Sequence, residues 1–187
     1  RSTPAVSSGE TNERRTSMFD KLRRARADLS TMNTLFPAAE RIAAGEGVDR
    51  PGAEHLLLAA FELEDGIGAE AFKTYNVTPD DLRTAIAAQH QDALLSVGVD
   101  ADDEAIAAAM PAVRSSTGPY QSQGSMQTAF QRSMALAKAD KAAINSGHLL
   151  LAVTEPDHGI VSRALDRLGV TKASLQQRTR QLLSNRA

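Results

Sequence analysis

The sequence predicts an all-α protein built from two copies of one helical unit, and three observations support this. Apolar residues recur with helical spacing along the chain, and no segment shows the strict alternation of a half-buried strand. Only 4% of the residues are aromatic and none is tryptophan, so the core must consist mainly of Ala, Leu, Ile and Val. Such small side chains suit closely packed helices. The third observation is an internal repeat.

The repeat relates residues 54–83 to residues 147–176 at a constant offset of 93, without a gap. Twelve of the thirty aligned positions are identical. They include the HLLLA segments that begin at His55 and His148, and the Gly-Ile pairs that begin at Gly66 and Gly159. Each copy offers a core helix, a turn and the start of another helix. We therefore expect the two copies to pack as a pseudo-twofold pair.

Capping and breaking residues indicate where the helices lie. Thr78 is suited to cap a helix that has Pro79 at its first position and acidic residues in its first turn. Asn145 or Ser146 is expected to cap the helix of the second HLLLA segment. The Ser-, Gly-, Pro- and Gln-containing stretch at 115–125 indicates a linker. The helices expected in order include 38–44, 53–63, 68–75, 79–95 and 126–143.

Four segments follow from this pattern. Residues 1–17 are polar with almost nothing to bury, so we expect a disordered tail. The first repeat should span 18–110, the linker 111–125 and the second repeat 126–187. The chain has no cysteine, which excludes disulfides and thiol chemistry. No apolar run approaches the roughly 18 residues that cross a membrane, and a cytoplasmic location is the default expectation.

The charges are unevenly distributed. Residues 51–113 contain two basic and twelve acidic residues, whereas residues 114–187 contain ten basic and four acidic ones. Two explanations stay open: oppositely charged lobes attract each other, or an acidic surface receives a cationic partner segment. The net charge of −2 argues against dedicated nucleic-acid binding. The basic second repeat nevertheless keeps nucleic-acid binding open as an alternative, and an ordinary solvated helix face is the other explanation of the same charges. The residues concerned are Arg163, Arg167, Lys172, Arg178 and Arg180.

The sequence predicts no catalytic site, metal or cofactor. His55 and His148 occupy equivalent repeat positions at helix starts, which indicates a structural role through hydrogen bonds to the backbone. The four histidines show no H-E-x-x-H spacing, and neither a G-x-S-x-G nor a G-x-x-x-x-G-K-[ST] motif occurs. An acidic cluster lacks the spacing of a calcium loop and is expected to begin a short helix that ends at Met110. Its members are Asp100, Asp102, Asp103 and Glu104.

The two copies resemble the Clp N-terminal repeat. The resemblance rests on EHLLL from Glu54 and GHLLL from Gly147, each followed by Gly-Ile, a short helix, an Asn-Val or Gly-Val turn and an amphipathic helix. The segment from Met18 to Arg26 (MFDKLRRAR) also resembles the opening of the ClpC branch. The resemblance implies two four-helix repeats that recruit substrates or adaptors to a AAA+ Clp unfoldase. No ATPase motif is present, so the chain is either a fragment of a longer unfoldase or a free-standing binding module, and its departures from the family pattern favour the free-standing module.

The resemblance also implies ligand-binding residues. The ClpC branch binds phosphorylated arginine and, in actinobacteria, cyclic-peptide antibiotics. The Glu before the His contacts the guanidinium there, and Glu54 matches it, although an acid at this position also suits the helix dipole. Gly147 stands at the matching position of the second repeat, so that pocket is expected to be lost. Phe19 and Arg26 match the antibiotic groove along the first helices.

Overall fold

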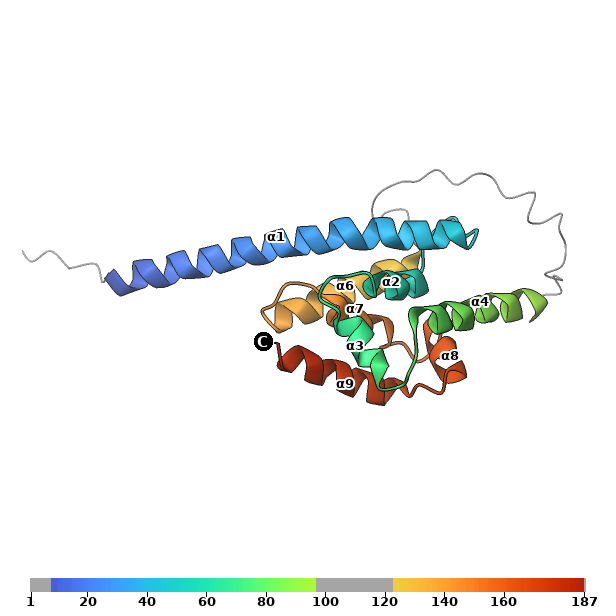
Figure 1. Ribbon diagram of the computed structural model, residues 1–187. Helices are drawn as coiled ribbons and strands as arrows, with labels where there is room; N and C mark the ends of the chain where they lie inside the picture. Colours follow the sequence, from blue (N-terminus) through green and yellow to red (C-terminus); the bar gives the residue numbers. More distant parts are fainter. Residues whose placement is uncertain (1–7, 97–122, 187) are drawn as a thin grey trace, which may run out of the picture.

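Eight α-helices, in two sets of four, occupy the described part of the chain (Figure 1). The computed structural model describes the backbone of residues 8–96 and 123–186 and the side chains of 18–92 and 123–186. No strand occurs in these residues, so the predicted all-α class is confirmed. The first set is α1 (Ser8–Gly45), α2 (Ala53–Ala60), α3 (Ile67–Lys73) and α4 (Pro79–Ser96). The second set is α6 (Gly124–Ala139), α7 (Ser146–Val153), α8 (Ile160–Arg167) and α9 (Lys172–Ser184).

The two sets pack with approximate twofold symmetry. The second helices of the repeats, α2 and α7, contact each other. Around them, α3 packs on α9 and α4 packs on α8, which are equivalent pairs once the repeats are exchanged. The first helices also pack equivalently, α1 on α2 and α6 on α7. The sequence repeat is therefore a repeat of structure.

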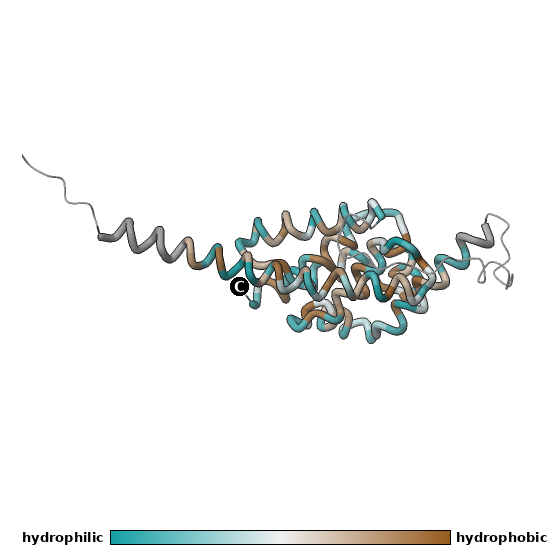
Figure 2. The backbone as a smooth tube through the Cα atoms, turned by 90° about the horizontal axis from the view of Figure 1, so that it is seen from above, coloured by the Kyte–Doolittle hydropathy of each residue, from teal (hydrophilic) through white to brown (hydrophobic). Residues whose placement is uncertain are grey.

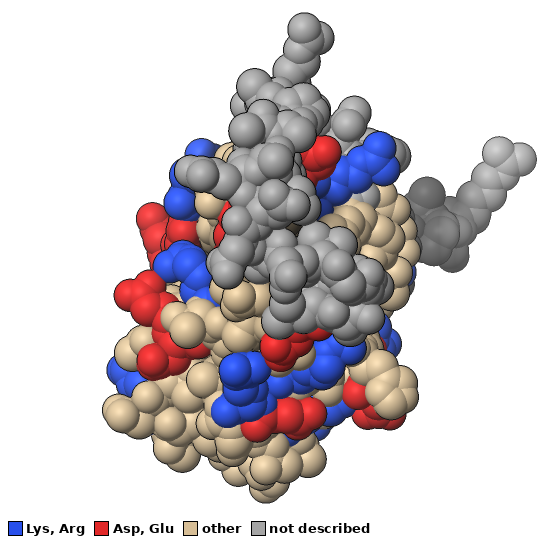
Figure 3. Space-filling model, turned by 90° about the vertical axis from the view of Figure 1, so that its right-hand side faces the viewer, with Lys and Arg blue, Asp and Glu red and all other residues tan. Residues whose placement is uncertain are grey.

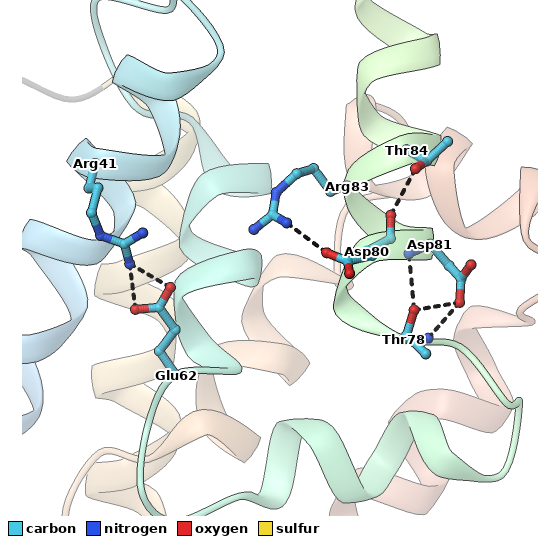
Figure 4. Close-up of polar contacts among 7 residues, drawn as sticks. All are labelled: Arg41, Glu62, Thr78, Asp80, Asp81, Arg83 and Thr84. Carbon is cyan, nitrogen blue, oxygen red and sulfur yellow. Dashed lines mark hydrogen bonds and ion pairs between the residues drawn. The ribbon is translucent and has the colours of Figure 1, made fainter.

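An ion pair recurs at the same place in both repeats. The Arg41 guanidinium donates to both carboxylate oxygens of Glu62 at 2.6 Å (Figure 4). In the second repeat Arg132 donates to both oxygens of Glu155 at 2.7 Å. Each pair ties the first helix of a repeat to the turn after its second helix. Exposed ion pairs of this kind stabilise a folded protein by at most about 1 kcal/mol each. They are informative mainly because they show that the two repeats have equivalent geometry.

Two helix starts agree with the predicted caps. Thr78 Oγ1 accepts a hydrogen bond from the backbone N–H of Asp81 at 3.2 Å, while the Asp81 carboxylate accepts one from the Thr78 N–H at 2.9 Å (Figure 4). At the start of α7, Asn145 Oδ1 accepts from the N–H groups of Gly147 and His148 at 3.0 and 3.1 Å. These bonds satisfy amides that the helix itself leaves unpaired.

The core is made chiefly of Leu, Ala, Ile and Val, as the composition predicts, and the apolar segments gather where the helices pack together (Figure 2). The HLLLA segments of α2 and α7 are buried throughout. The largest fully buried side chains are Phe72, Leu35, Leu56, Leu57, Ile67, Leu82, Ile86, Met126, Leu149, Leu150, Leu165 and Leu175. Among the described residues, no helix is both long and apolar enough to cross a membrane.

The first helix is much longer than the sequence predicts. Instead of a short helix at 38–44 after a disordered tail, α1 is a single helix of 38 residues with Pro37 inside it. Proline usually ends a helix because it lacks an N–H and clashes with the preceding turn. Here Leu35, Phe36, Ala38 and Ala39 are all buried on either side of it, and their packing offsets that cost. Extending a formed helix also costs less than starting one, which lets the polar residues from Ser8 onward continue it.

Other differences are smaller. Helix α6 ends at Ala139, four residues before the predicted end, and begins at Gly124 inside the expected linker. Residues 1–7, the short acidic helix expected before Met110 and most of the linker lie outside the described residues.

Candidate ligand-binding pocket

A pocket of about 390 Å³ lies between the two repeats, with Glu54 of α2 in its wall. The first repeat contributes the N-terminus of α2, and the second contributes α6, the end of α7 and the start of α8. The Glu54 residue is only 3% exposed. The other lining residues include Ala53, Ser125, Thr128, Arg132, Glu155, His158, Ile160, Ser162 and Arg163. An acidic group thus lies in the wall of a largely apolar cavity.

The Glu54 carboxylate sits among imidazoles instead of beside a lysine or arginine. Its Oε1 lies 3.3 Å from His55 Nδ1 and 3.9 Å from His90 Nε2, and it accepts no hydrogen bond within the described residues. Burial opposes the charge, but the neighbouring His55 and His90 more than compensate and lower the pKa of Glu54 below its usual value. Glu54 is therefore an ionised, buried carboxylate at neutral pH.

Gly52 makes room for this carboxylate. A Cβ at position 52 would lie 2.4 Å from Glu54 Oε1, well inside contact distance. The Gly52 N–H also donates to His55 Nδ1 at 2.8 Å, which ties the loop before α2 to its first turn. This is the arrangement expected of a structural histidine, because the fully buried ring bonds the backbone that precedes it.

The protonation of His55 is governed by opposing effects. Burial disfavours a charged ring, but the Glu46 and Glu54 carboxylates outweigh it and raise the pKa of His55 to about 9. The Nε2 of the ring lies 3.3 Å from the Glu46 carboxylate and its Nδ1 lies 3.3 Å from the Glu54 carboxylate, so each ring nitrogen has an acid beside it.

Two arginines lie at the mouth of the pocket. Arg132 is held by Glu155, and Arg163 Nε donates to Gln89 Oε1 of α4 at 3.1 Å. Both side chains are exposed. The pocket thus combines a buried negative charge with a mouth that carries positive groups, an arrangement that suits a ligand with a cationic inner end.

The second repeat has no room for a side chain at the position that matches Glu54. Gly147 replaces the glutamate, and a Cβ there would lie 2.9 Å from both Ile67 Cγ2 and Leu183 Cδ2. The repeat offset places Leu183 opposite His90, so an apolar contact in the second repeat takes the place of the Glu54–His90 contact in the first. The sequence expectation that a second pocket is absent therefore has a physical basis.

In the second repeat, the start of α7 is bound by Asp65 of the first repeat. Its carboxylate accepts hydrogen bonds from the backbone N–H groups of Ser146 and Ile67, both at 3.0 Å, and from the Ser146 hydroxyl. The offset places His158 opposite Asp65, and His158 lines the open pocket. The two repeats thus carry different residue types, Asp65 and His158, at this aligned position.

His148 has a different environment from its counterpart His55. Its Nε2 lies 3.2 Å from Asp140 Oδ2, and its Nδ1 has no hydrogen bond within the described residues. The preceding loop is held instead by the Asn145 cap. Burial lowers the pKa of His148 below its usual value, despite the opposing effect of Asp140.

The glycines of the Gly-Ile pairs allow positive backbone φ angles. Gly66 and Gly159 have φ of 64° and 126°, and each immediately precedes the third helix of its repeat. Residues with a Cβ rarely adopt such angles, which explains why glycine stands at both positions.

The structure does not bring Phe19 and Arg26 to this pocket. Both are exposed on the N-terminal half of α1, and neither lines the pocket. The sequence did not connect His90 or Arg132 with a binding site, and it suggested Arg163 only for nucleic-acid binding. Extending the repeat alignment beyond Arg83 would have placed His90 opposite an apolar residue and marked it as unusual.

The basic residues considered for nucleic-acid binding are mostly engaged within the protein. Arg167 pairs with Asp92 at 3.2 Å, and Arg178 lies 3.9 Å from Glu70. Lys172 bonds Asp157 at 2.9 Å, and Figure 3 shows positive and negative side chains intermingled on one face. These contacts favour the explanation in which the acidic and basic lobes attract each other. The described residues contain no group of three or more His, Cys, Asp or Glu placed to hold a metal.

The fold and pocket define a helical double-repeat domain with a pocket between its repeats. Comparison with family models matches residues 30–139, more than half of the chain, to the Clp repeat N-terminal domain. The chain therefore belongs to the Clp repeat N-terminal domain family.

Solved structures share the fold. One is the N-terminal domain of the caseinolytic protease associated chaperone ClpD from Arabidopsis thaliana, with a TM-score of 0.58 and 19% identity over 82% of this chain and 92% of that chain. A second comes from preliminary structural investigations of a malarial protein secretion system, with a TM-score of 0.52 and 16% identity over 81% of this chain and 90% of that one. Comparison with curated protein sequences finds no match.

Proposed function

We propose that this protein is a non-catalytic binding module of the Clp protease system that recognises substrate or adaptor proteins through the pocket at Glu54. The observation that carries this proposal is the ionised Glu54 carboxylate, 3% exposed and lining a 390 Å³ pocket, without a lysine or arginine partner in the described residues. An ionised carboxylate in the wall of a pocket attracts a cationic ligand group.

Arginine is the side chain that suits this site best. Its planar guanidinium can donate two parallel hydrogen bonds to a carboxylate, whereas lysine offers a single point charge. The apolar surface of the pocket would accommodate the methylene stem. Arg132 and Arg163 at the mouth could contact an anionic group carried by the ligand, which supports phosphorylated arginine as a candidate.

Within the Clp system, a domain of this kind would deliver bound proteins to a AAA+ unfoldase or withhold them from it. Sequestration of a cyclic peptide is the related alternative, with Phe19 and Arg26 on α1 as candidate contacts. Those two residues lie apart from the Glu54 pocket, so the peptide would occupy a second, separate surface.

The decisive experiment is calorimetric titration with a phosphoarginine peptide and its unmodified arginine twin. Glu54→Gln removes the charge and keeps the shape of the side chain, while Glu62→Gln removes an exposed acid outside the pocket and serves as the matched control. We expect the first variant to weaken binding at least tenfold and the second to leave it unchanged. Equal affinity of both variants for either peptide would refute recognition through Glu54.

A further inference from the structure

Apolar residues on the N-terminal half of α1 form an uncovered surface. The large hydrophobic side chains that are strongly exposed in the described residues are Met18, Phe19, Leu22 and Leu29, at 65%, 64%, 61% and 58%. All four lie within twelve residues of one helix, part of which extends beyond the packed helices (Figures 1 and 2). Scattered exposed apolar residues are ordinary, but a group on one helix marks an interaction surface.

These residues follow the spacing of a coiled coil. Met18, Leu22, Ala25 and Leu29 succeed one another at intervals of four, three and four residues. The same spacing continues to Met32 and Phe36, which pack against the core of this domain. Such a heptad pattern keeps one apolar face turned toward a partner helix. The stripe is thus an extension of a core-facing surface, and it precedes residue 30, where the family match begins.

Another face of the helix is fixed to the body of the protein. Arg24 donates to the Lys141 carbonyl at 2.7 Å, and Asp28 accepts from the Ile144 N–H at 2.8 Å. Thr31 Oγ1 donates to the Ile144 carbonyl at 3.3 Å. Because residues 24, 28 and 31 share one side of the helix, these contacts set its rotation and leave the stripe from Met18 to Leu29 uncovered.

We propose that this stripe pairs in antiparallel orientation with the same stripe of a second copy of the chain. In that register Met18 packs on Leu29 of the second copy, and Leu22 packs on Ala25 of the second copy. Each contact occurs twice because of the twofold symmetry. The small side chain of Ala25 lets the two helices approach closely near the centre of the pairing.

The flanking residues support this occupant and this orientation. Antiparallel pairing sets Lys21 beside Asp28 of the second copy and Phe19 beside Arg26 of the second copy, an ion pair and a cation–π contact. Asp28 uses Oδ1 for Ile144 and, within the described residues, makes no hydrogen bond through Oδ2. Parallel pairing would instead set Lys21 beside Arg26, so two like charges would meet.

The paired segment is short. Twelve residues extend about 18 Å, so the interface is small and the dimer should be weak and dependent on concentration. The pairing does not involve Glu54, and it can fail or succeed independently of ligand binding at the pocket.

Sedimentation equilibrium of the full chain over a wide concentration range tests the pairing. We expect the average mass to rise toward twice the monomer mass, and Leu22→Asp to abolish the rise. Ser30→Asp, which adds the same charge at an exposed position beside the stripe, should leave it unchanged. Circular dichroism of both variants checks that the helices are retained. A monomer at every concentration, or equal dimerisation of all three proteins, would overturn the proposal.

Cysteine cross-linking tests the orientation, since the natural chain has no cysteine. A mixture of Met18→Cys and Leu29→Cys proteins should form the mixed disulfide under mild oxidation in preference to either homodimer. Preferential homodimers of Leu22→Cys would indicate parallel pairing and refute the register. Binding of the monomer to anionic vesicles, in place of dimerisation, would show that the stripe serves a membrane surface and would likewise overturn the proposal.

Discussion

Replacement of Gly147 by alanine tests the claim that the second repeat has no space for a ligand-binding side chain. The new Cβ would lie 2.9 Å from Ile67 Cγ2 and from Leu183 Cδ2, so both side chains must move by several tenths of an ångström. Overpacking of this kind typically costs about 1–3 kcal/mol. Alanine also favours a helix over glycine by up to about 1 kcal/mol, which offsets part of that cost.

We therefore expect Gly147→Ala to lower the free energy of unfolding by about 1–2 kcal/mol, or the Tm by roughly 2–8 °C for a chain of this size. Urea denaturation followed by circular dichroism at 222 nm measures the change. Gly45→Ala is the matched control, because nothing lies within 4 Å of a Cβ at that position. It should be neutral or slightly stabilising.

The double variant Gly147→Ala/Leu183→Ala shows whether crowding by Leu183 causes the loss of stability. Shortening Leu183 should remove most of the penalty of Gly147→Ala, giving a favourable coupling of about 1 kcal/mol in a double-mutant cycle. If Gly147→Ala were as stable as the natural protein, or if the effects of the two substitutions on stability were simply additive, crowding around position 147 would be the wrong explanation for the glycine there.

Three further predictions concern charged and capping groups. Glu54→Gln should lower the free energy of unfolding in urea denaturation at pH 7, because the pKa of Glu54 is lowered in the folded protein and its ionised form therefore stabilises the fold; an unchanged or higher value would contradict this cause. Asp65→Ala should destabilise the protein by about 1–2 kcal/mol, because the Ser146 and Ile67 amides lose their acceptor; an unchanged midpoint would contradict that contact. Burial lowers the pKa of His148, so its contribution to stability is present above pH 6.5 and is lost as the pH falls through the folded-state pKa. NMR titration should give His148 a midpoint below 6.5, and a midpoint at or above 6.5 would refute this cause.

The helices that the sequence predicts best are those whose ends carry local signals. Thr78 and Asp81 form reciprocal hydrogen bonds at the start of α4, and Asn145 caps α7, because capping depends on residues within one turn. The length of α1 could not be predicted in this way. Pro37 is a local signal to stop, and only the burial of its neighbours, which comes from other helices, overrides that signal.

The candidate site likewise combines features that the sequence predicts with features that depend on tertiary packing. The repeat pattern singles out Glu54 and its replacement by Gly147, since those positions align within the sequence. The contribution of Arg132 and Arg163 to the mouth of the pocket depends on how the second repeat packs against the first. No spacing along the chain contains that information.

By itself, the sequence determined the helical class, the two copies of one unit and the asymmetry between their glutamate and glycine, because each follows from periodicity or from aligned residue types. Only the tertiary structure decided which side chains surround these two positions. At both positions the opposite repeat contributes side chains: Ile67 of the first repeat lies beside Gly147, and Arg163 of the second repeat lines the pocket that contains Glu54. The space around a residue is set by the close packing of distant segments, and the chain acquires it only when the two repeats come together.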